Sequence, residues 1–264
     1  GNVVLSSEEP VLVQSMLNTS TREVDACVEQ AIRIIEAGGR LVRITAPGVK
    51  EAEMLGEIHR RLRERGYTTP ISADIHFVAE AASVAARYVE KVRINPGNFA
   101  DKRATFKKLT YTDEEYAAEL EILRQKFTEF LEVCRQYGTA VRIGTNHGSL
   151  SDRIMSRYGD TPAGMVEATM EYLRVCQACD FKDVVISLKS SDCRTMVDAV
   201  RLLVEKMEAE GMCYPLHLGV TEAGEGEDGR IRSAVGIGTL LNEGIGDTIR
   251  VSLTEEPEAE FPVA

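Results

Sequence analysis

Short apolar runs alternate along this chain with longer stretches in which apolar residues recur every three or four positions. The short runs are rich in β-branched residues and predict strands, whereas the three- and four-residue spacing predicts amphipathic helices. The predicted strands lie near residues 11–16, 40–45, 70–77, 89–95, 140–146, 183–189, 214–220 and 247–254. The predicted helices lie near residues 22–37, 49–65, 78–87, 115–137, 162–179, 192–210 and 230–242. The pattern is a strand followed by a helix, seven times, and then a last strand.

Eight strands alternating with helices predict an α/β fold, a parallel (β/α)8 TIM barrel, with an open doubly wound sheet as the alternative. Residues 96–116 are too many for an ordinary strand-to-helix loop, so we expect an elaborated loop after the fourth strand, acting as a lid or a partner contact. After Thr254 the chain carries only an acidic, proline-containing tail, so no clear eighth helix is predicted. We therefore expect a barrel domain over 1–256 and a linker over 257–264 that leads toward a further C-terminal region.

Composition and charge narrow the class of protein. The 264 residues are 44% hydrophobic and 28% charged, which is ordinary for a globular protein, and no apolar run reaches the roughly 18 residues of a membrane span. A net charge of −11 argues against nucleic acid as a partner. No signal or transit pattern begins the sequence, and the six cysteines do not form a disulfide framework, so a cytoplasmic location with reduced thiols is expected. An anionic ligand would need a local positive site.

Four arginines interrupt apolar, β-branched stretches of the predicted strands. They are Arg43, Arg93, Arg142 and Arg250. Because side chains alternate across a strand, the apolar neighbours face the helices and each arginine faces the barrel axis, near the carboxyl ends where barrel enzymes build their active sites. An unpaired buried charge costs several kcal/mol. The arginines must therefore be balanced by a bound polyanion or by the carboxylates of Asp74, Glu222 or Asp247.

Hydrogen-bond donors outnumber acceptors at the same strand ends. They include Asn95, Asn146, Ser149, Lys189, Ser190 and Ser252, beside several glycines. Guanidinium forks, a compact ammonium group, hydroxyls and open backbone amides are what a phosphate or diphosphate requires. The residues alone thus indicate a phosphorylated small-molecule ligand.

Other candidate groups have more than one interpretation. His76, His147 and His217 end predicted strands and favour hydrogen bonding or proton transfer over a zinc or iron site, so no metal site is predicted. Glu222, beside glycines after the seventh strand, is the carboxylate best placed for chemistry, with simple pairing to an arginine as the alternative. The "CQAC" stretch at 176–179 lies late in a predicted helix and indicates buried thiols rather than cluster ligands.

Several motifs, taken in order, resemble the barrel domain of the 4-hydroxy-3-methylbut-2-enyl diphosphate synthase family. They are "PVLVQSMLNTSTRE", "VRIT", "ADIHF", "VRINPGN", "VRIGTNHGSLSDRIM", "LHLGVTEAG" and "SAVGIGTLLNEGIGDTIRVSLT", and they cover about residues 10–256. The insertion around 98–116 is similar to the larger form of the family, in which an additional domain follows the barrel. The resemblance implies reductive ring opening of 2-C-methyl-D-erythritol 2,4-cyclodiphosphate in the methylerythritol phosphate pathway. Electrons would come from ferredoxin or flavodoxin through a [4Fe-4S] cluster in a separate C-terminal domain.

The resemblance also implies roles for single residues. Diphosphate contacts fall on Arg43, Arg93, Arg142, Lys189 and Ser252, with a polar contact from Asn146 and a further match at Arg250. Glu222 matches a glutamate that assists proton transfer or stabilises a bound intermediate, and Asp74 and His76 lie in a motif near the site. The cluster ligands, three cysteines and a glutamate, are absent from this chain, so we expect it to bind substrate without turning it over. A homodimer is left open, and a pterin-binding, dihydropteroate-synthase-like barrel and a non-catalytic barrel that braces a partner are the alternatives.

Overall fold

Eight parallel strands form one closed sheet in the computed structural model, which describes residues 3–6, 8–76, 78–101 and 110–264. The strands are β1 (Leu12–Met16), β2 (Leu41–Thr45), β3 (Ile71–Asp74), β4 (Lys91–Ile94), β5 (Ala140–Asn146), β6 (Val184–Lys189), β7 (His217–Leu218) and β8 (Thr248–Ile249). Their order is β6-β5-β4-β3-β2-β1-β8-β7, and a parallel bridge between Ile186 and Leu216 joins β6 to β7. The predicted TIM barrel is therefore confirmed.

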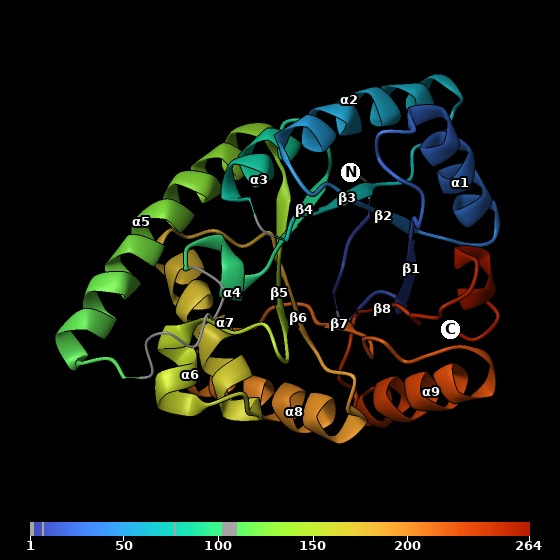
Figure 1. Cartoon of the computed structure of the whole chain (residues 1–264). Helices are drawn as coiled ribbons and strands as arrows, with labels where there is room; N and C mark the ends of the chain where they lie inside the picture. The colour runs from blue at the N-terminus through green and yellow to red at the C-terminus, as the bar shows by residue number, and fades with distance from the viewer. Residues whose placement is uncertain (1–2, 7, 77, 102–109) are drawn as a thin grey trace.

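Helices surround the sheet (Figure 1). They are α1 (Val24–Glu36), α2 (Val49–Glu64), α3 (Ala79–Ala85), α4 (Pro96–Phe99), α5 (Asp113–Tyr137), α6 (Asp152–Tyr158), α7 (Pro162–Ala178), α8 (Cys193–Ala209) and α9 (Gly226–Asn242). The seven predicted helices are present to within a few residues, whereas α4 and α6 were not predicted because both are short and follow a strand inside a long loop. Local signals explain the boundaries: α5 begins with a capping box of Thr112 and Glu115 and ends at Gly138, whose φ is 66°. None of the helices in the described ranges is long and apolar enough to cross a membrane.

The core lies between the sheet and this ring of helices. Val92 and Ile94 of β4 and Val141 and Ile143 of β5 are all fully buried there. These four side chains point outward, toward the helices. Because side chains alternate along a strand, the residues between them, among them Arg93 and Arg142, point toward the barrel axis. The predicted inward placement of the arginines follows from this packing.

The acidic tail folds back onto the barrel wall. Residues Pro257–Glu260 form a 3-10 helix, η1, which lies between the ends of α1 and α9 in Figure 1. An ion pair of 2.6 Å joins Arg33 of α1 to Glu258, and the hydroxyl of Ser15 in β1 donates to Glu260 at 2.6 Å. The first residues of the expected linker thus pack against the barrel, and the division of the chain at residue 256 stays a prediction.

The strand register places the inward-facing side chains on successive levels of the barrel. Arg43 pairs with Ser72, Ser72 with Lys91, and Arg93 with Arg142. In a closed eight-stranded barrel with a stagger of about eight residues, paired residues differ by about one residue in height, so alternate strands share a level. From the amino end upward, the first level holds Leu41, Lys91, Val185 and Thr248, and the second holds Gln14, Ser72, Arg142 and His217. The third level holds Arg43, Arg93, Ser187 and Arg250, and the fourth holds Met16, Asp74, Gly144 and Gly219. The fifth level holds Thr45, Asn95, Lys189 and Ser252.

Candidate functional site: a cationic cluster inside the barrel

Arg43 and Arg93 share one buried carboxylate, that of Asp74. Nη2 of Arg43 lies 3.0 Å from Oδ2 of Asp74, and Nη1 of Arg93 lies 3.1 Å from its Oδ1. Arg93 also donates to the carbonyl of Gly144 at 2.6 Å. Burial alone would raise the pKa of the Asp74 carboxyl, but the charges of the surrounding arginines outweigh it and hold that pKa well below its usual value. Asp74 is therefore ionised and fixes two guanidinium groups in place.

Arg142 has no carboxylate partner among the described residues. Its side chain is 2% exposed, Nη1 donates to the hydroxyl of Ser187 at 2.6 Å, and Nε is buried without a partner. Burial and then the charges of Arg43 and Arg93 lower the pKa of its guanidinium. Arg142 is thus the arginine whose charge is least compensated, directly below the Arg43–Asp74–Arg93 bridge.

Arg250 is held by a carboxylate that the sequence did not point to. Its Nε and Nη2 lie 3.1 and 2.8 Å from the two carboxylate oxygens of Glu260, and Nη1 contacts the sulfur of Met16 at 3.3 Å. Asp247, one of the three expected partners, instead accepts from the backbone N–H of Leu216 at 2.7 Å. The acidic tail was visible in the sequence, but its return to β8 was not.

Lys189 and Ser252 stand on a level above the arginines. Lys189 is 7% exposed, and its ammonium group makes no hydrogen bond within the described part of the chain. Burial and then the nearby arginine charges lower the pKa of Lys189 well below its usual value. A Cβ on Gly219 would lie 2.8 Å from Nζ of Lys189, so the glycine leaves room for this lysine over the strand.

The remaining predicted site residues are Asn95, Asn146, His76 and Glu222. Asn95 donates to Ser149 Oγ at 2.9 Å and accepts from the N–H of Gly97, so it caps α4 and joins two loops. Asn146 is half-buried, and His76 is half-buried with a pKa lowered to about 4 by burial and by Arg93. Glu222 is exposed in the turn after β7, with a φ of 52° and no contact to the cluster among the described residues. Its catalytic role stays a prediction.

The other motifs are accounted for outside the cluster. His147 faces Asp160 at 3.6 Å, and Nδ1 of His217 lies 2.6 Å from the amide nitrogen of Gln14 inside the barrel. Cys176 is a buried thiol of α7, as expected, and burial raises its pKa. The described residues contain no group of three His, Cys, Asp or Glu side chains suited to a metal ion.

Positive charge exceeds negative charge in this interior. The basic side chains are Arg43, Lys91, Arg93, Arg142, Lys189 and Arg250, and the carboxylates paired with the arginines are Asp74 and Glu260, so the arginines alone outnumber the carboxylates. Lys91 was missed by the sequence reasoning, although its place two residues before Arg93 on the same strand put it on the same face. Since unpaired buried charges are costly, the arrangement is suited to an anion carrying more than one negative charge.

Comparison with known proteins decides the family. The family described as GcpE TIM-barrel domain matches residues 1–264. The chain belongs to this family. It is 65% identical, over its whole length and 43% of the relative, to "4-hydroxy-3-methylbut-2-en-1-yl diphosphate synthase (flavodoxin)" of Parabacteroides distasonis. It is 54% identical, over 99% of the chain and 35% of the relative, to "4-hydroxy-3-methylbut-2-en-1-yl diphosphate synthase (ferredoxin), chloroplastic" of Arabidopsis thaliana. The chain thus spans less than half the length of these relatives.

Solved structures agree on the barrel alone. Dihydropteroate synthase of Yersinia pestis superposes with a TM-score of 0.56 at 13% identity, covering 94% of this chain and 89% of that one. The E. coli 3-keto-D-glucoside 4-epimerase YcjR gives a TM-score of 0.58 at 12% identity, covering 96% and 97%. At such identities the likeness shows the fold and carries no activity.

The barrel carries a hollow at its carboxyl end, between the loops that follow β1 and β2. A hollow of about 610 Å³ is lined by the β1–α1 loop from Leu17 to Arg22 together with Thr45, Pro47, Gly48 and Glu51. A separate cavity of about 320 Å³ lies at the opposite, amino end, where Leu41, Pro70 and Val185 meet residues 3–5. The lining of the first hollow includes Thr45, which shares a barrel level with Lys189 and Ser252, and it includes none of the barrel arginines.

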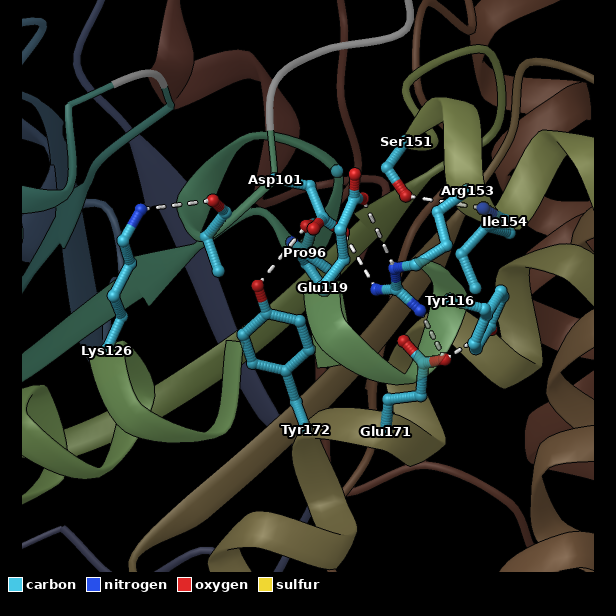
Figure 2. Close-up of polar contacts among 12 residues, drawn as sticks. Pro96, Asp101, Tyr116, Glu119, Lys126, Ser151, Arg153, Ile154, Glu171 and Tyr172 are labelled. Carbon is cyan, nitrogen blue, oxygen red and sulfur yellow. Dashed lines mark hydrogen bonds and ion pairs between the residues drawn. The ribbon is translucent and has the colours of Figure 1, made fainter. Parts of the chain in front are cut away.

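A second polar cluster braces the loops that follow β4 and β5 (Figure 2). Arg153 is 1% exposed and lies 2.8 Å from Asp101 and 2.6 Å from Glu171. The hydroxyl of Tyr172 donates to the carbonyl of Pro96 at 3.3 Å. The root of the elaborated loop is thereby fixed to α6 and α7. Residues 102–109 of that loop lie outside the described part of the chain, and its role as a lid or a partner contact stays a prediction.

Proposed function

We propose that this chain is the substrate-binding barrel of an iron–sulfur reductase in isoprenoid biosynthesis by the methylerythritol phosphate pathway. The complete enzyme converts 2-C-methyl-D-erythritol 2,4-cyclodiphosphate to (E)-4-hydroxy-3-methylbut-2-enyl diphosphate. Membership of the GcpE family and the names of the relatives support the reaction. The observation in this chain that carries the proposal is the excess of inward-facing arginines over the carboxylates paired with them in the described part of the chain, which suits an anion of about two charges.

The ligand's diphosphate would lie between the arginines and Lys189, near the level of Gly144 and Gly219, where the missing side chains leave room for those of Arg93 and Lys189. Arg43, Arg93 and Arg142 face this space from below, and Lys189 and Ser252 face it from above. Guanidinium groups give forked contacts to phosphate oxygens, and the lysine gives a compact charge. Asp74 leaves part of each guanidinium free while preventing Arg43 and Arg93 from turning away. Arg250 lines the site rather than gripping the diphosphate, because two of its nitrogens already bond to Glu260.

Asn146, Asn95, His76 and Glu222 complete the proposed site. His76, with a pKa lowered to about 4, is neutral near pH 7 and offers hydrogen bonds without adding to the positive charge. Asn95 acts by holding the loop of Ser149 in place. Glu222 is the group proposed for proton transfer, and its exposure in a turn requires that it approach the ligand when the site is complete.

The reduction requires a [4Fe-4S] cluster, which would supply electrons in the complete enzyme. The described residues do not fit a cluster site, since they hold no group of three His, Cys, Asp or Glu side chains suited to a metal, so its ligands are assigned to another part of the protein. The names of the relatives specify flavodoxin or ferredoxin, and we extend one of these electron donors to this protein. A cytoplasmic location completes the proposal, and the oligomeric state is left open.

Phosphorus-31 NMR tests the function directly. The cyclodiphosphate has two distinct phosphorus nuclei, and both signals should shift or broaden when this chain is added, while a pterin added to the same sample should leave them unchanged. Arg174→Met removes an arginine on the outer helix α7, away from the barrel interior. This variant should shift the phosphorus signals as the wild type does, and it therefore controls for loss of positive charge elsewhere on the protein. Adding a reductant should yield no product with this chain alone. Competition by the pterin would favour the dihydropteroate-synthase-like alternative, and no phosphorus shift would favour a scaffolding barrel.

A further inference from the structure

Lys91 is the lowest cation of the barrel interior. It precedes Arg93 by two residues on β4 and shares its level with Leu41, Val185 and Thr248. The side chain is 4% exposed, and Nζ is buried without a hydrogen-bond partner among the described residues. Lys91 also lines the amino-end cavity together with Glu90 and Asp183, but its Nζ is itself buried, so a charged ammonium group here would be poorly solvated.

The groups that face Lys91 provide no negative charge. Ser72 of β3 is its register partner, and Arg142 of β5 and His217 of β7 occupy the level above. Arg43 of β2 stands one level higher, and Gln14 of β1 is bonded to His217. Burial and then the charges of Arg142 and Arg43 lower the pKa of Lys91 to about 7.

Nearby carboxylates are engaged elsewhere. Asp74 lies three levels above Lys91 and is bridged to two arginines. Glu90, at the start of β4, accepts from Arg63 at 2.7 Å and from the N–H of Ile71 at 2.8 Å. Glu260 is paired with Arg250. Asp183 is the exception: it lines the amino-end cavity together with Lys91, beside Lys182 and just before β6.

We propose that Lys91 is a proton-linked residue of this site: its amine is uncharged beneath the empty cationic cluster and takes up a proton when a dianion binds above it. The step adds one proton from solvent to a neutral amine and involves no transfer of electrons. Two negative charges in the barrel offset the repulsion from Arg142 and Arg43, so the charged form of Lys91 is favoured again. The inference rests on the proposed function only in naming the cyclodiphosphate as the natural dianion.

Proton uptake by Lys91 makes the affinity for the dianion depend on pH. The complex holds more protons than the free chain, so affinity for the dianion is highest where Lys91 is already charged and falls as pH rises. Above the free pKa of about 7, the association constant should fall by about tenfold per pH unit from this group alone. The fall should end at the pKa of the complex, which lies above that of the free chain because the dianion offsets the arginine repulsion while Lys91 stays buried.

Isothermal titration in two buffers of different ionisation enthalpy measures the uptake. The two titrants are the cyclodiphosphate and inorganic sulfate, whose charges both stay fixed near neutral pH, so every proton counted belongs to the protein. At about pH 8 the wild-type chain should take up roughly one more proton per ligand than Lys91→Met, and the difference should vanish near pH 5.5. Lys182→Met removes an exposed lysine at the same end of the barrel and should match the wild type.

Each outcome decides the inference. Equal uptake by the wild type and Lys91→Met, or no binding of either titrant, overturns it. Binding of sulfate with Lys91-dependent uptake, but no binding of the cyclodiphosphate, sustains the role of Lys91 and rejects the proposed function. If Lys91→Met does not fold, the Nζ resonance of Lys91 in the wild type gives the same answer: its midpoint should lie near pH 7 without sulfate and shift upward with it.

Discussion

Arg250 and Glu260 form a two-pronged ion pair that joins the end of β8 to η1, with N–O distances of 3.1 and 2.8 Å. Glu260 is 1% exposed and also accepts from Ser15 of β1. The tail residue therefore neutralises one arginine of the cluster and holds η1 against the barrel.

Glu260→Gln should destabilise the chain. Removing one partner of a buried pair costs roughly 3–5 kcal/mol, because the other charge is left uncompensated. The matched control is Glu258→Gln, which breaks the partly exposed pair with Arg33 and should cost about 1 kcal/mol or less. Urea unfolding followed by circular dichroism measures both. Equal losses in the two variants would show that Glu260 does not anchor the tail.

The ion pairs of Asp74 should make the free energy of unfolding depend on pH in the acid range. The pKa of its carboxyl is held well below the unfolded value of about 3.9, so the unfolded chain binds a proton before the native chain does. The stabilisation from Asp74 is thus present above about pH 4 and is lost as pH falls toward the folded pKa. Asp74→Asn should be less stable than the wild type at pH 7 and should lose stability less steeply below pH 4. Parallel curves for the two proteins between about pH 4 and 2 would contradict this assignment.

Gly219→Ala tests the space above the arginines. The added Cβ would lie 2.8 Å from Nζ of Lys189 and 2.9 Å from the carbonyl of Arg250, so Lys189 must move. We expect a loss of dianion affinity of about tenfold or more, since one charge-assisted contact is worth roughly 1.5–3 kcal/mol. Gly238→Ala, in α9 with no atom within 4 Å of the new Cβ, should leave affinity unchanged and stabilise the helix by about 1 kcal/mol. Calorimetry on both variants distinguishes the two effects.

Lys91 makes a separate prediction for stability. Its lowered pKa means that between about pH 7 and 10 the unfolded chain binds a proton that the native chain does not. The free energy of unfolding of the wild type should therefore rise with pH, relative to Lys91→Met, by about 1.4 kcal/mol per pH unit across that window. A constant difference between the two proteins would mean that Lys91 stays charged in the native state.

Most of the fold could be predicted from the sequence because it rests on local patterns. Alternation around Arg93 and Arg142 gave both the strands and the inward direction of the arginines, and the helix spacing gave seven of the helices. The pairing of Asp74 was foreseen as one of three options, and Asp74 is the last residue of β3, on the inward face of the sheet. The role of Asn95 as the cap of α4 was not, because a cap is recognised only when the turn it closes is known.

What could not be predicted depends on contacts between distant parts of the chain. The pairing of Glu260 with Arg250 requires the tail to turn back onto the barrel, and no local periodicity encodes that turn. Lys91 and Val185 lie on strands that are not neighbours in the sheet, and their shared level depends on the closed register of the barrel. Arg153 pairs with both Asp101 and Glu171 and so joins three separate segments. Such pairings become visible only once the sheet has closed.

The most direct test of the account is the melting temperature of this chain with and without 2-C-methyl-D-erythritol 2,4-cyclodiphosphate, repeated on Arg142→Ala. At about 100 times its dissociation constant the ligand should add roughly 2.7 kcal/mol to the free energy of unfolding. The account predicts a clear upward shift for the wild type and little or none for Arg142→Ala. An equal shift in both proteins, or none in the wild type, would contradict the assignment of the barrel arginines as the diphosphate site.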